Sequence, residues 1–169
     1  MASRPTVDPP HPSGPDSPTA VVELVVNLDD ATPEVVGDAT QTLMDGGALD
    51  VWATPIQMKK QRPGVMLSVL CLPEVVQATA RRVMELTGSF GVRFRGWDRL
   101  VLEREHVEAE TRLGPVSVKL GRLDGELVTA QPEFDAVRAL ADSAEVPVRV
   151  AMDAARAAAD RLLAEGGGR

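Results

Sequence analysis

The stretch from Asp50 to Gly64, which reads DVWATPIQMKKQRPG, concentrates residue types that bind phosphate. Lys59, Lys60 and Arg62 place three cations within four residues, in a chain whose formal net charge is −7. Like charges held together near a turn repel one another unless water screens them or an anion lies among them. Lys supplies a point charge, Arg a forked donor, and Gly64 a backbone that a ligand can approach closely. The stretch is therefore either a polyphosphate site or a solvated hairpin tip.

Oxygen-bearing side chains stand where the first expected strand ends. Asn27, Asp29 and Asp30 close this strand just before the sequence Thr-Pro-Glu at 32–34, which is typical of a helix start. Amide and carboxylate oxygens suit a hard cation such as Mg²⁺ or Mn²⁺, which keeps several waters and binds substrate phosphates. Asn27 and Asp29 share a face by the two-residue period of a strand. The alternative is that Asp30 caps the helix and Asp29 is solvated.

A third polar stretch lies between Thr87 and Arg93. It offers the Ser89 hydroxyl, the backbone N–H groups around Gly91 and the Arg93 guanidinium. A glycine-containing loop with Ser and Arg can bind phosphate, although this pattern is common. The alternative interpretation is a helix C-cap followed by a turn.

Other kinds of chemistry have little support in the sequence. Cys71 occupies an apolar strand position, which indicates a core residue, and the single cysteine fits a reducing compartment. His106 has no cysteine partner, so the usual zinc ligands are missing. Trp52 and Trp97 are expected to pack rather than to stack on bases.

Composition bounds the class of protein. The 169 residues are enough for one domain with a sizeable core, and 44% of them are hydrophobic. The acidic balance argues against nucleic acid as a partner, because unspecific affinity rests on a basic surface. We expect no membrane partner and a cytoplasmic location, because the chain has neither a run of about eighteen apolar residues nor a signal pattern. The proline-rich arm over 1–19 is expected to be disordered.

Apolar periodicity predicts the fold class. Alternation predicts strands near 21–28, from 49, at 65–71 and at 92–95, and helical spacing predicts helices after the first and third of them. This order of two split β-α-β units is typical of a ferredoxin-like βαββαβ sheet with both helices on one face. The prediction is therefore an α+β fold.

The second half of the chain adds further elements. Alternating residues over 100–111 and 116–120 predict an added β-hairpin, and a short strand is expected at 127–130. C-terminal helices are expected to open at Pro132 and Pro147. We expect one domain over 20–165 and a disordered tail over 166–169.

Two of these motifs together resemble a known family. Residues 27–34, NLDDATPE, are similar to the N-[IV]-D-D-x-[TN]-P-E signature in the C-terminal domain of the nickel insertion family LarC. Residues 54–64 look like the family's most distinctive run, T-P-I-x-M-K-K-x-R-P-G. The resemblance covers roughly residues 21–163. It implies a domain that binds CTP with Mn²⁺ or Mg²⁺.

The resemblance also implies an activity. The family inserts nickel, as a substrate, into a pyridinium bis-thiocarboxylate mononucleotide and completes the nickel-pincer nucleotide cofactor, while CTP is hydrolysed to CMP and pyrophosphate. This chain would be part of such a CTP-dependent cyclometallase, a nickel chelatase of the lyase class. Carried over by motif, the metal ligands would be Asp29 and Asp30. The nucleotide-binding residues would be Asn27, Lys59, Lys60, Arg62, Ser89, Gly91, Arg93, Arg104, Lys119 and Glu133.

The chain departs from the family pattern in ways that set further expectations. Val25 stands where members usually carry a Glu, and no His-rich N-terminal domain precedes the match. We therefore expect the nickel ligands on a separately encoded N-terminal-like subunit, and a homo-oligomer built through the Ala-rich last helix. The alternative function is a non-catalytic, ACT-like module that binds a small ligand or builds an oligomer.

Overall fold

A computed structural model describes residues 19–166 of the chain. Contacts divide these residues into two compact units that meet in sequence between Arg99 and Leu100, and we describe each unit by itself. The expected disorder of the proline-rich arm and of the tail lies outside the described residues, apart from Thr19 and Gly166. The structure places Thr19 in the first strand and Gly166 in the last helix.

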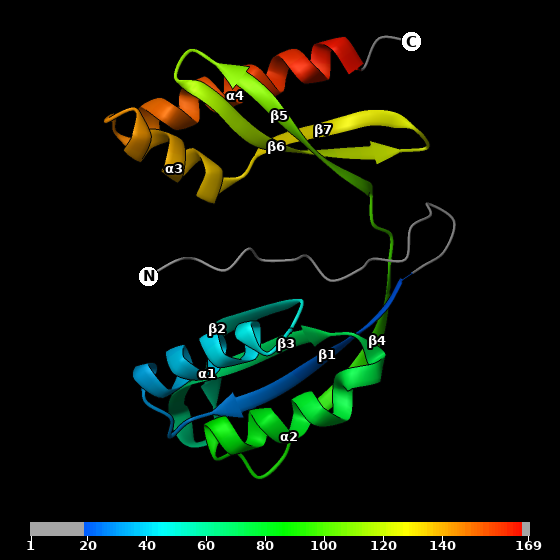
Figure 1. The fold of residues 1–169 in the computed structure, drawn as a ribbon. Coiled ribbons are helices and arrows are strands. Elements are labelled where there is room, and N and C mark those ends of the chain that lie inside the picture. The colour runs from blue at the N-terminus through cyan, green and yellow to red at the C-terminus, as the bar shows by residue number, and fades with distance from the viewer. Residues whose placement is uncertain (1–18, 167–169) are drawn as a thin grey trace. The chain divides into compact units, whose positions relative to one another are not determined.

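Unit 1 contains a four-stranded antiparallel sheet in the order β2-β3-β1-β4. This order, with α1 and α2 after the first and third strands, is the ferredoxin-like arrangement, so the predicted fold is confirmed (Figure 1). The elements of unit 1 are β1 (Thr19–Leu28), α1 (Pro33–Asp45), β2 (Asp50–Met58), η1 (Lys59–Gln61), β3 (Arg62–Cys71), η2 (Pro73–Val75), α2 (Val76–Thr87) and β4 (Arg93–Arg99).

One face of this sheet carries the core of unit 1. Every second residue of β1 and β3 is buried against α1 and α2, as the alternation predicts. The buried side chains are Leu24, Val26, Leu28, Val36, Ala39, Leu43, Leu67, Val69, Cys71, Ala80 and Val83. The opposite face has no helix of unit 1 on it, and we call it the helix-free face. Its side chains include those of Glu23, Val25, Asn27, Met66, Ser68, Arg93 and Arg95.

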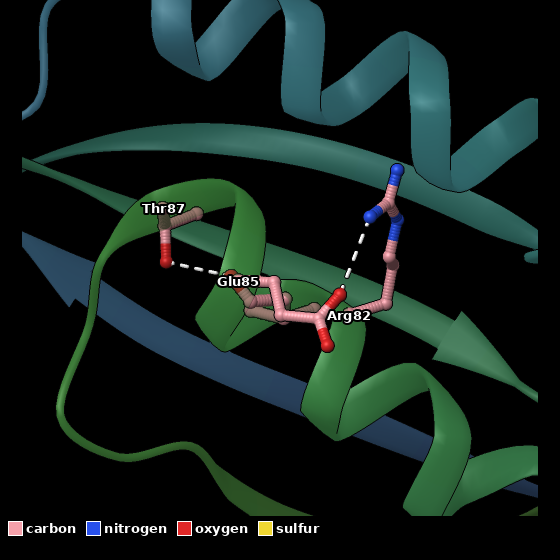
Figure 2. A network of polar contacts seen from close by, with 4 residues as sticks. Arg82, Glu85 and Thr87 are labelled. Atoms are coloured by element: carbon pink, nitrogen blue, oxygen red, sulfur yellow. Dashed lines mark hydrogen bonds and ion pairs between the residues drawn. The ribbon is translucent and has the colours of Figure 1, made fainter.

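Local hydrogen bonds cap the start of α1 and the end of α2. The Thr32 hydroxyl accepts from the Val35 N–H at 3.4 Å and caps the start of α1. Figure 2 shows the end of α2, where the Thr87 hydroxyl donates to the Val83 carbonyl at 2.7 Å. Gly88 then takes a left-handed φ of 69°, which a side chain would disfavour. These caps set where the chain enters α1 and where it leaves α2 on its way to β4.

Unit 2 contains a second sheet, of three antiparallel strands in the order β5-β6-β7. The predicted hairpin is present as β5 and β6, and the expected short strand extends it into a separate sheet. Two helices cover one face (Figure 1). The elements are β5 (Glu103–Thr111), β6 (Gly114–Leu123), β7 (Glu126–Pro132), α3 (Phe134–Ser143) and α4 (Val148–Gly166).

Small side chains let α4 approach this second sheet closely. Its buried positions are all alanines, namely Ala151, Ala154, Ala155, Ala158 and Ala159. They pack with Val116, Val118, Leu127, Val137 and Leu140 in the core of unit 2. In the part of the chain that the structure describes, no helix is both long and apolar enough to traverse a bilayer.

Candidate functional site

Three segments of unit 1 meet at one end of its sheet. Antiparallel pairing of Leu28 with Val65 places the end of β1 beside the start of β3. The β2–β3 tip, closed by the pairing of Met58 with Arg62, lies at this same end. Pairing of Val25 with Arg93 brings the start of β4 there as well. We call the residues gathered there the strand-end cluster: Asn27, Asp29, Asp30, Lys59, Lys60, Arg62 and Arg93.

Two long-range side-chain contacts hold part of this cluster together. Arg62 Nη1 lies 3.1 Å from Asp29 Oδ2, and Arg93 Nη2 donates to Asn27 Oδ1 at 2.8 Å. The Arg62 side chain remains 56% exposed, so only part of its guanidinium is engaged. Lys59 and Lys60 are exposed on η1, and Asp30 is exposed after β1. The structure thus brings one expected metal ligand next to one expected phosphate-binding residue.

The backbone of the hairpin tip is unusual. Lys60 and Gln61 both have φ of 59°, the left-handed region that side chains rarely adopt. Such conformations cost free energy and persist where the surrounding structure determines them. A Cβ on Gly64 would lie 2.7 Å from the Leu28 carbonyl oxygen, so only glycine lets β3 pass the end of β1. Both features fix how Lys59, Lys60 and Arg62 are presented.

Ser89 and Gly91 form a local turn just before β4. The Ser89 hydroxyl donates to the Gly91 carbonyl at 3.0 Å, and the Gly91 N–H approaches the same hydroxyl at 3.4 Å. The loop is therefore a turn closed by its own hydroxyl, as the alternative interpretation of this stretch expected. It leads directly into Arg93 at the same end of the sheet.

The remaining expected residues belong to unit 2. Arg104, Lys119 and Glu133 share the face of the second sheet that carries no helix of that unit. Glu133 accepts from the Ser117 hydroxyl at 3.2 Å, and its other oxygen lies 3.4 Å from His106 Nδ1. Lys119 pairs across the strands with His106. Of these residues, Glu133 is the one with side-chain contacts described here, and all three lie within unit 2.

The donor atoms of the strand-end cluster determine what metal it could hold. Asp29 and Asp30 offer carboxylate oxygens, which suit Mg²⁺ or Mn²⁺ when water and phosphate oxygens complete the shell. Within residues 19–166, no group of three or more His, Cys, Asp or Glu side chains is arranged to hold a metal ion. The residues present thus fit a hard divalent cation that arrives with a phosphate ligand.

Four residues on the helix-free face, Glu23, Met66, Arg95 and Trp97, were not expected as site residues from the sequence. Glu23 accepts from Trp97 Nε1 at 2.9 Å, and the Arg95 guanidinium stacks on the Trp97 ring at 3.7 Å. Met66 lies 3.7 Å from Arg93 Nη2. Trp97 is 43% exposed, so its ring packs against the Arg95 guanidinium at the surface rather than in the core. The alternation of Arg93 and Arg95 along β4 was the one available signal, because it placed both on the polar face.

The surroundings of Cys71 and Glu34 shift the pKa values of their side chains. Cys71 is fully buried in the core of unit 1, as expected, and this burial raises the pKa of its thiol. At the start of α1, hydrogen bonds from the Glu34 backbone and the Thr32 hydroxyl lower the pKa of the Glu34 carboxyl. Neither residue belongs to the strand-end cluster.

Comparison with known proteins finds a family and relatives that the chain matches. The family model described as nickel insertion protein matches residues 11–152. A relative from Myxococcus xanthus, named as a nickel insertion protein, is 45% identical over 78% of the chain, and one from Pelobacter propionicus is 40% identical over 87%. The chain spans about a third of their length, 34% and 37% respectively.

The chain also resembles solved structures, of which two are described. One is LarC2, the C-terminal domain of a cyclometallase involved in the synthesis of the NPN cofactor of lactate racemase, in its apo form. It is 34% identical, with a TM-score of 0.78 over 83% of this chain and 97% of the domain. The other is a protein of Methanopyrus kandleri, 35% identical, with a TM-score of 0.59 over 85% of this chain and 88% of that one.

The fold and the matches identify the class of protein and then the family. The chain is an α+β protein with a ferredoxin-like sheet and a second sheet covered by C-terminal helices. It belongs to the nickel insertion protein family, in which it corresponds to a LarC C-terminal domain.

Proposed function

We propose that this chain binds CTP together with Mn²⁺ or Mg²⁺ and serves nickel insertion as the nucleotide-binding part of a cyclometallase. The observation that supports this most is the strand-end cluster, where cations and carboxylates from three segments lie together. A triphosphate carries several negative charges, and its metal ion needs hard oxygen ligands. The cluster offers both at one end of one sheet.

Each residue of the cluster has a role in this proposal. Lys59, Lys60 and Arg62 bind the phosphate oxygens and stabilise the charge that develops on pyrophosphate as it leaves CMP. Asp29 and Asp30 would hold the divalent cation, which would supply positive charge next to the phosphates. The 3.1 Å contact between Arg62 and Asp29 supports this proposal, because it brings a cation and a carboxylate from distant segments side by side.

The remaining residues hold or orient the nucleotide. Asn27 orients Arg93 through their 2.8 Å hydrogen bond, so that the other guanidinium nitrogens stay available. Ser89 and Gly91 contribute phosphate contacts only if their mutual hydrogen bond opens. Arg104, Lys119 and Glu133, which lie on unit 2, are proposed as secondary contacts.

The proposal leaves nickel to the other part of the enzyme. Nickel is the substrate here, and imidazole and thiolate ligands suit it better than the carboxylates of the strand-end cluster do. An N-terminal-like part, on whichever polypeptide it lies, would supply those ligands. Assembly into a homo-oligomer and action in the cytoplasm belong to the same proposal.

The test is isothermal titration of Mn²⁺·CTP into the full chain and into the double variant Lys59→Ala/Lys60→Ala. Each charge-assisted contact contributes about 1.5–3 kcal/mol, so the double variant should lose at least about a hundredfold in affinity. The matched control is Arg82→Ala, because Arg82 is an exposed cation of unit 1 that pairs with Glu85 on α2 at 3.3 Å (Figure 2).

The outcomes separate the proposal from the ACT-like alternative. Affinity that is lost in the double variant and kept in Arg82→Ala supports a triphosphate site at the hairpin tip. Equal affinity in all three proteins contradicts that site. If Mn²⁺·CTP neither binds nor raises the melting temperature of the unchanged chain, the alternative function, a non-catalytic ACT-like module, is favoured.

A further inference from the structure

The ion pair between Arg62 and Asp29 engages two groups that the proposed ligand also needs. Arg62 Nη1 lies 3.1 Å from Asp29 Oδ2, which is a hydrogen-bond distance. The guanidinium is one of the proposed phosphate donors, and the carboxylate is one of the two proposed metal ligands. A cation that uses Asp29 must therefore compete with Arg62 for the same oxygen.

The two partners of this ion pair differ in their freedom to move. The Asp29 side chain is 21% exposed, whereas the Arg62 side chain is 56% exposed. Asp29 directly follows β1, whose last residue, Leu28, pairs with Val65 of β3. The short carboxylate therefore stays in place, and a change of partner falls to the longer and more exposed arginine.

The backbone that carries Arg62 is fixed by the hairpin. Arg62 pairs with Met58 across β2 and β3, and the two residues before it, Lys60 and Gln61, hold left-handed φ values of 59°. A guanidinium can still change its position by rotation about its own side-chain torsions, which have several staggered minima. Arg62 can thus leave Asp29 without any movement of the hairpin tip.

A divalent cation without phosphate meets this arrangement unfavourably. To use Asp29 it must displace Arg62, which then loses a carboxylate partner and gains no anion. The displaced guanidinium joins Lys59 and Lys60 as positive charge at the same strand end, and like charges within a few ångströms repel one another. Two carboxylates also leave most of the coordination shell of a hard cation to water.

A polyphosphate changes the outcome because it offers Arg62 a new anion. Guanidinium groups bind phosphate oxygens in the same forked geometry in which they bind carboxylates. Arg62 can therefore pass from Asp29 to a phosphate oxygen with little net loss of interaction, and the Asp29 oxygen becomes available as a metal ligand. Lys59 and Lys60 then face an anion as well.

Arg93, the other arginine of the strand-end cluster, lacks this coupling. Its Nη2 donates to Asn27 Oδ1 at 2.8 Å, and this partner is a neutral amide. A guanidinium has further N–H donors that can bind phosphate while such a bond persists. Removal of Arg93 therefore releases no carboxylate, and the two arginines together separate the ion pair from the general effect of charge.

We propose that Arg62 makes the strand-end cluster selective for a metal–polyphosphate complex over the free divalent cation, because it releases Asp29 only when a phosphate oxygen takes its place. The inference rests on the proposed function and adds the form in which the metal enters the site. Arg62 is then a phosphate-binding residue and also the residue that determines this specificity.

The test compares Mn²⁺ alone with Mn²⁺·tripolyphosphate on the full chain and on Arg62→Met, which keeps an unbranched side chain without charge or donors. The electron paramagnetic resonance signal of free Mn²⁺ measures binding of the cation alone, and isothermal titration measures binding of the complex. Arg62→Met should bind Mn²⁺ alone at least about threefold more tightly, because neither the ion pair nor its charge opposes the cation. The same variant should bind the complex about tenfold or more weakly, because a charge-assisted contact to phosphate is lost.

Matched variants test whether net charge alone explains such a result. Arg93→Met removes the same charge from the strand-end cluster but leaves Asp29 paired, so affinity for Mn²⁺ alone should rise by less than about twofold. Arg82→Met removes an exposed cation that pairs with Glu85 on α2 at 3.3 Å and should change neither affinity (Figure 2). Equal gains in Mn²⁺ affinity for Arg93→Met and Arg62→Met would contradict the exchange.

The outcomes separate failure of this inference from failure of the proposed function. If the complex binds the unchanged chain but Arg62→Met shows no gain for Mn²⁺ alone, the selectivity by Arg62 is overturned and the phosphate site is still supported. If the complex does not bind the unchanged chain, the proposed function is contradicted, and the selectivity with it.

A second variant covers the case in which Arg62→Met does not fold. Arg62→Gln keeps a polar side chain at this exposed position and removes the charge. It should change both affinities in the same directions as Arg62→Met, with a gain of about twofold or more for Mn²⁺ alone. A loss of affinity for both Mn²⁺ alone and the complex would contradict the exchange.

Discussion

Units 1 and 2 both cover one face of an antiparallel sheet with two helices, but they differ in what lies at the helix–sheet interface. Unit 1 packs Val and Leu side chains from both layers, such as Leu24 and Leu67 against Leu43. Unit 2 packs a helix whose buried positions are alanines, so its backbone can approach the sheet more closely. The two cores share no residue.

The units also differ in where their charged residues lie. In unit 1, acids and cations gather at a strand end, and contacts such as Arg62 with Asp29 join distant segments. In unit 2, the polar residues spread over a sheet face, where Glu133 contacts Ser117 and His106. The charged groups of unit 1 are thus gathered at one end of its sheet, where we propose the main ligand site, whereas those of unit 2 lie along a strand face.

The largest expected effect tests whether the two cores are independent. Leu67 is completely buried in unit 1, and Leu67→Ala should lower the free energy of unfolding of that unit by about 2–5 kcal/mol, because it leaves a cavity. Hydrogen exchange should accelerate in residues 19–99 and stay unchanged in residues 100–166. Val118→Ala, at a completely buried position of unit 2, should give the reverse pattern. Faster exchange in both units from either change would show that they unfold together.

A smaller effect tests the hairpin tip that distinguishes unit 1. Gly64→Ala should cost about 1–3 kcal/mol, because its Cβ would lie 2.7 Å from both the Leu28 carbonyl oxygen and Met58 Sδ. Gly37→Ala is the matched control, because its Cβ meets nothing within 4 Å inside α1. It should stabilise the protein by about 0.5–1 kcal/mol. Urea denaturation measures both, and a stabilising Gly64→Ala would mean that the strands do not pass so closely.

The smallest effect concerns pH at the start of α1. The pKa of Glu34 is lowered in the folded state, so its contribution to stability is present above its ordinary pKa of 4.5 and is lost as pH falls through the lower folded value. Glu34→Gln should therefore destabilise the protein slightly at pH 7 and reduce the loss of stability in acid. In unit 2, the residue before α3 makes no side-chain cap. Melting temperatures from pH 3 to 7 measure this, and identical profiles for both proteins would contradict it.

Much of the fold could be predicted because its determinants are local. Alternation in β1 and helical spacing after Pro33 indicated the elements, and their order indicated the ferredoxin-like sheet. The second sheet was only half predicted. The hairpin signal was local, whereas the pairing of Leu120 with Ala130 that adds β7 was not.

The candidate site was likewise predicted only in part from the sequence. The cations of residues 59–62 and the acids at 29 and 30 were visible as chemistry in the sequence, and their spacing indicated phosphate and a hard cation. Glu23 and Trp97 gave no such signal, because each is a single residue in an ordinary strand. Their contact joins positions 74 residues apart.

What the sequence determined by itself is thus the kind of chemistry and the type of each element, since both depend on residues within a few positions of one another. Tertiary structure decided which groups meet: Asp29 with Arg62 over 33 residues, and Asn27 with Arg93 over 66. The physical reason is strand register. Pairing β1 centrally between β3 and β4 fixes every cross-strand neighbour at once, and a shift of one residue would turn each of these side chains to the other face.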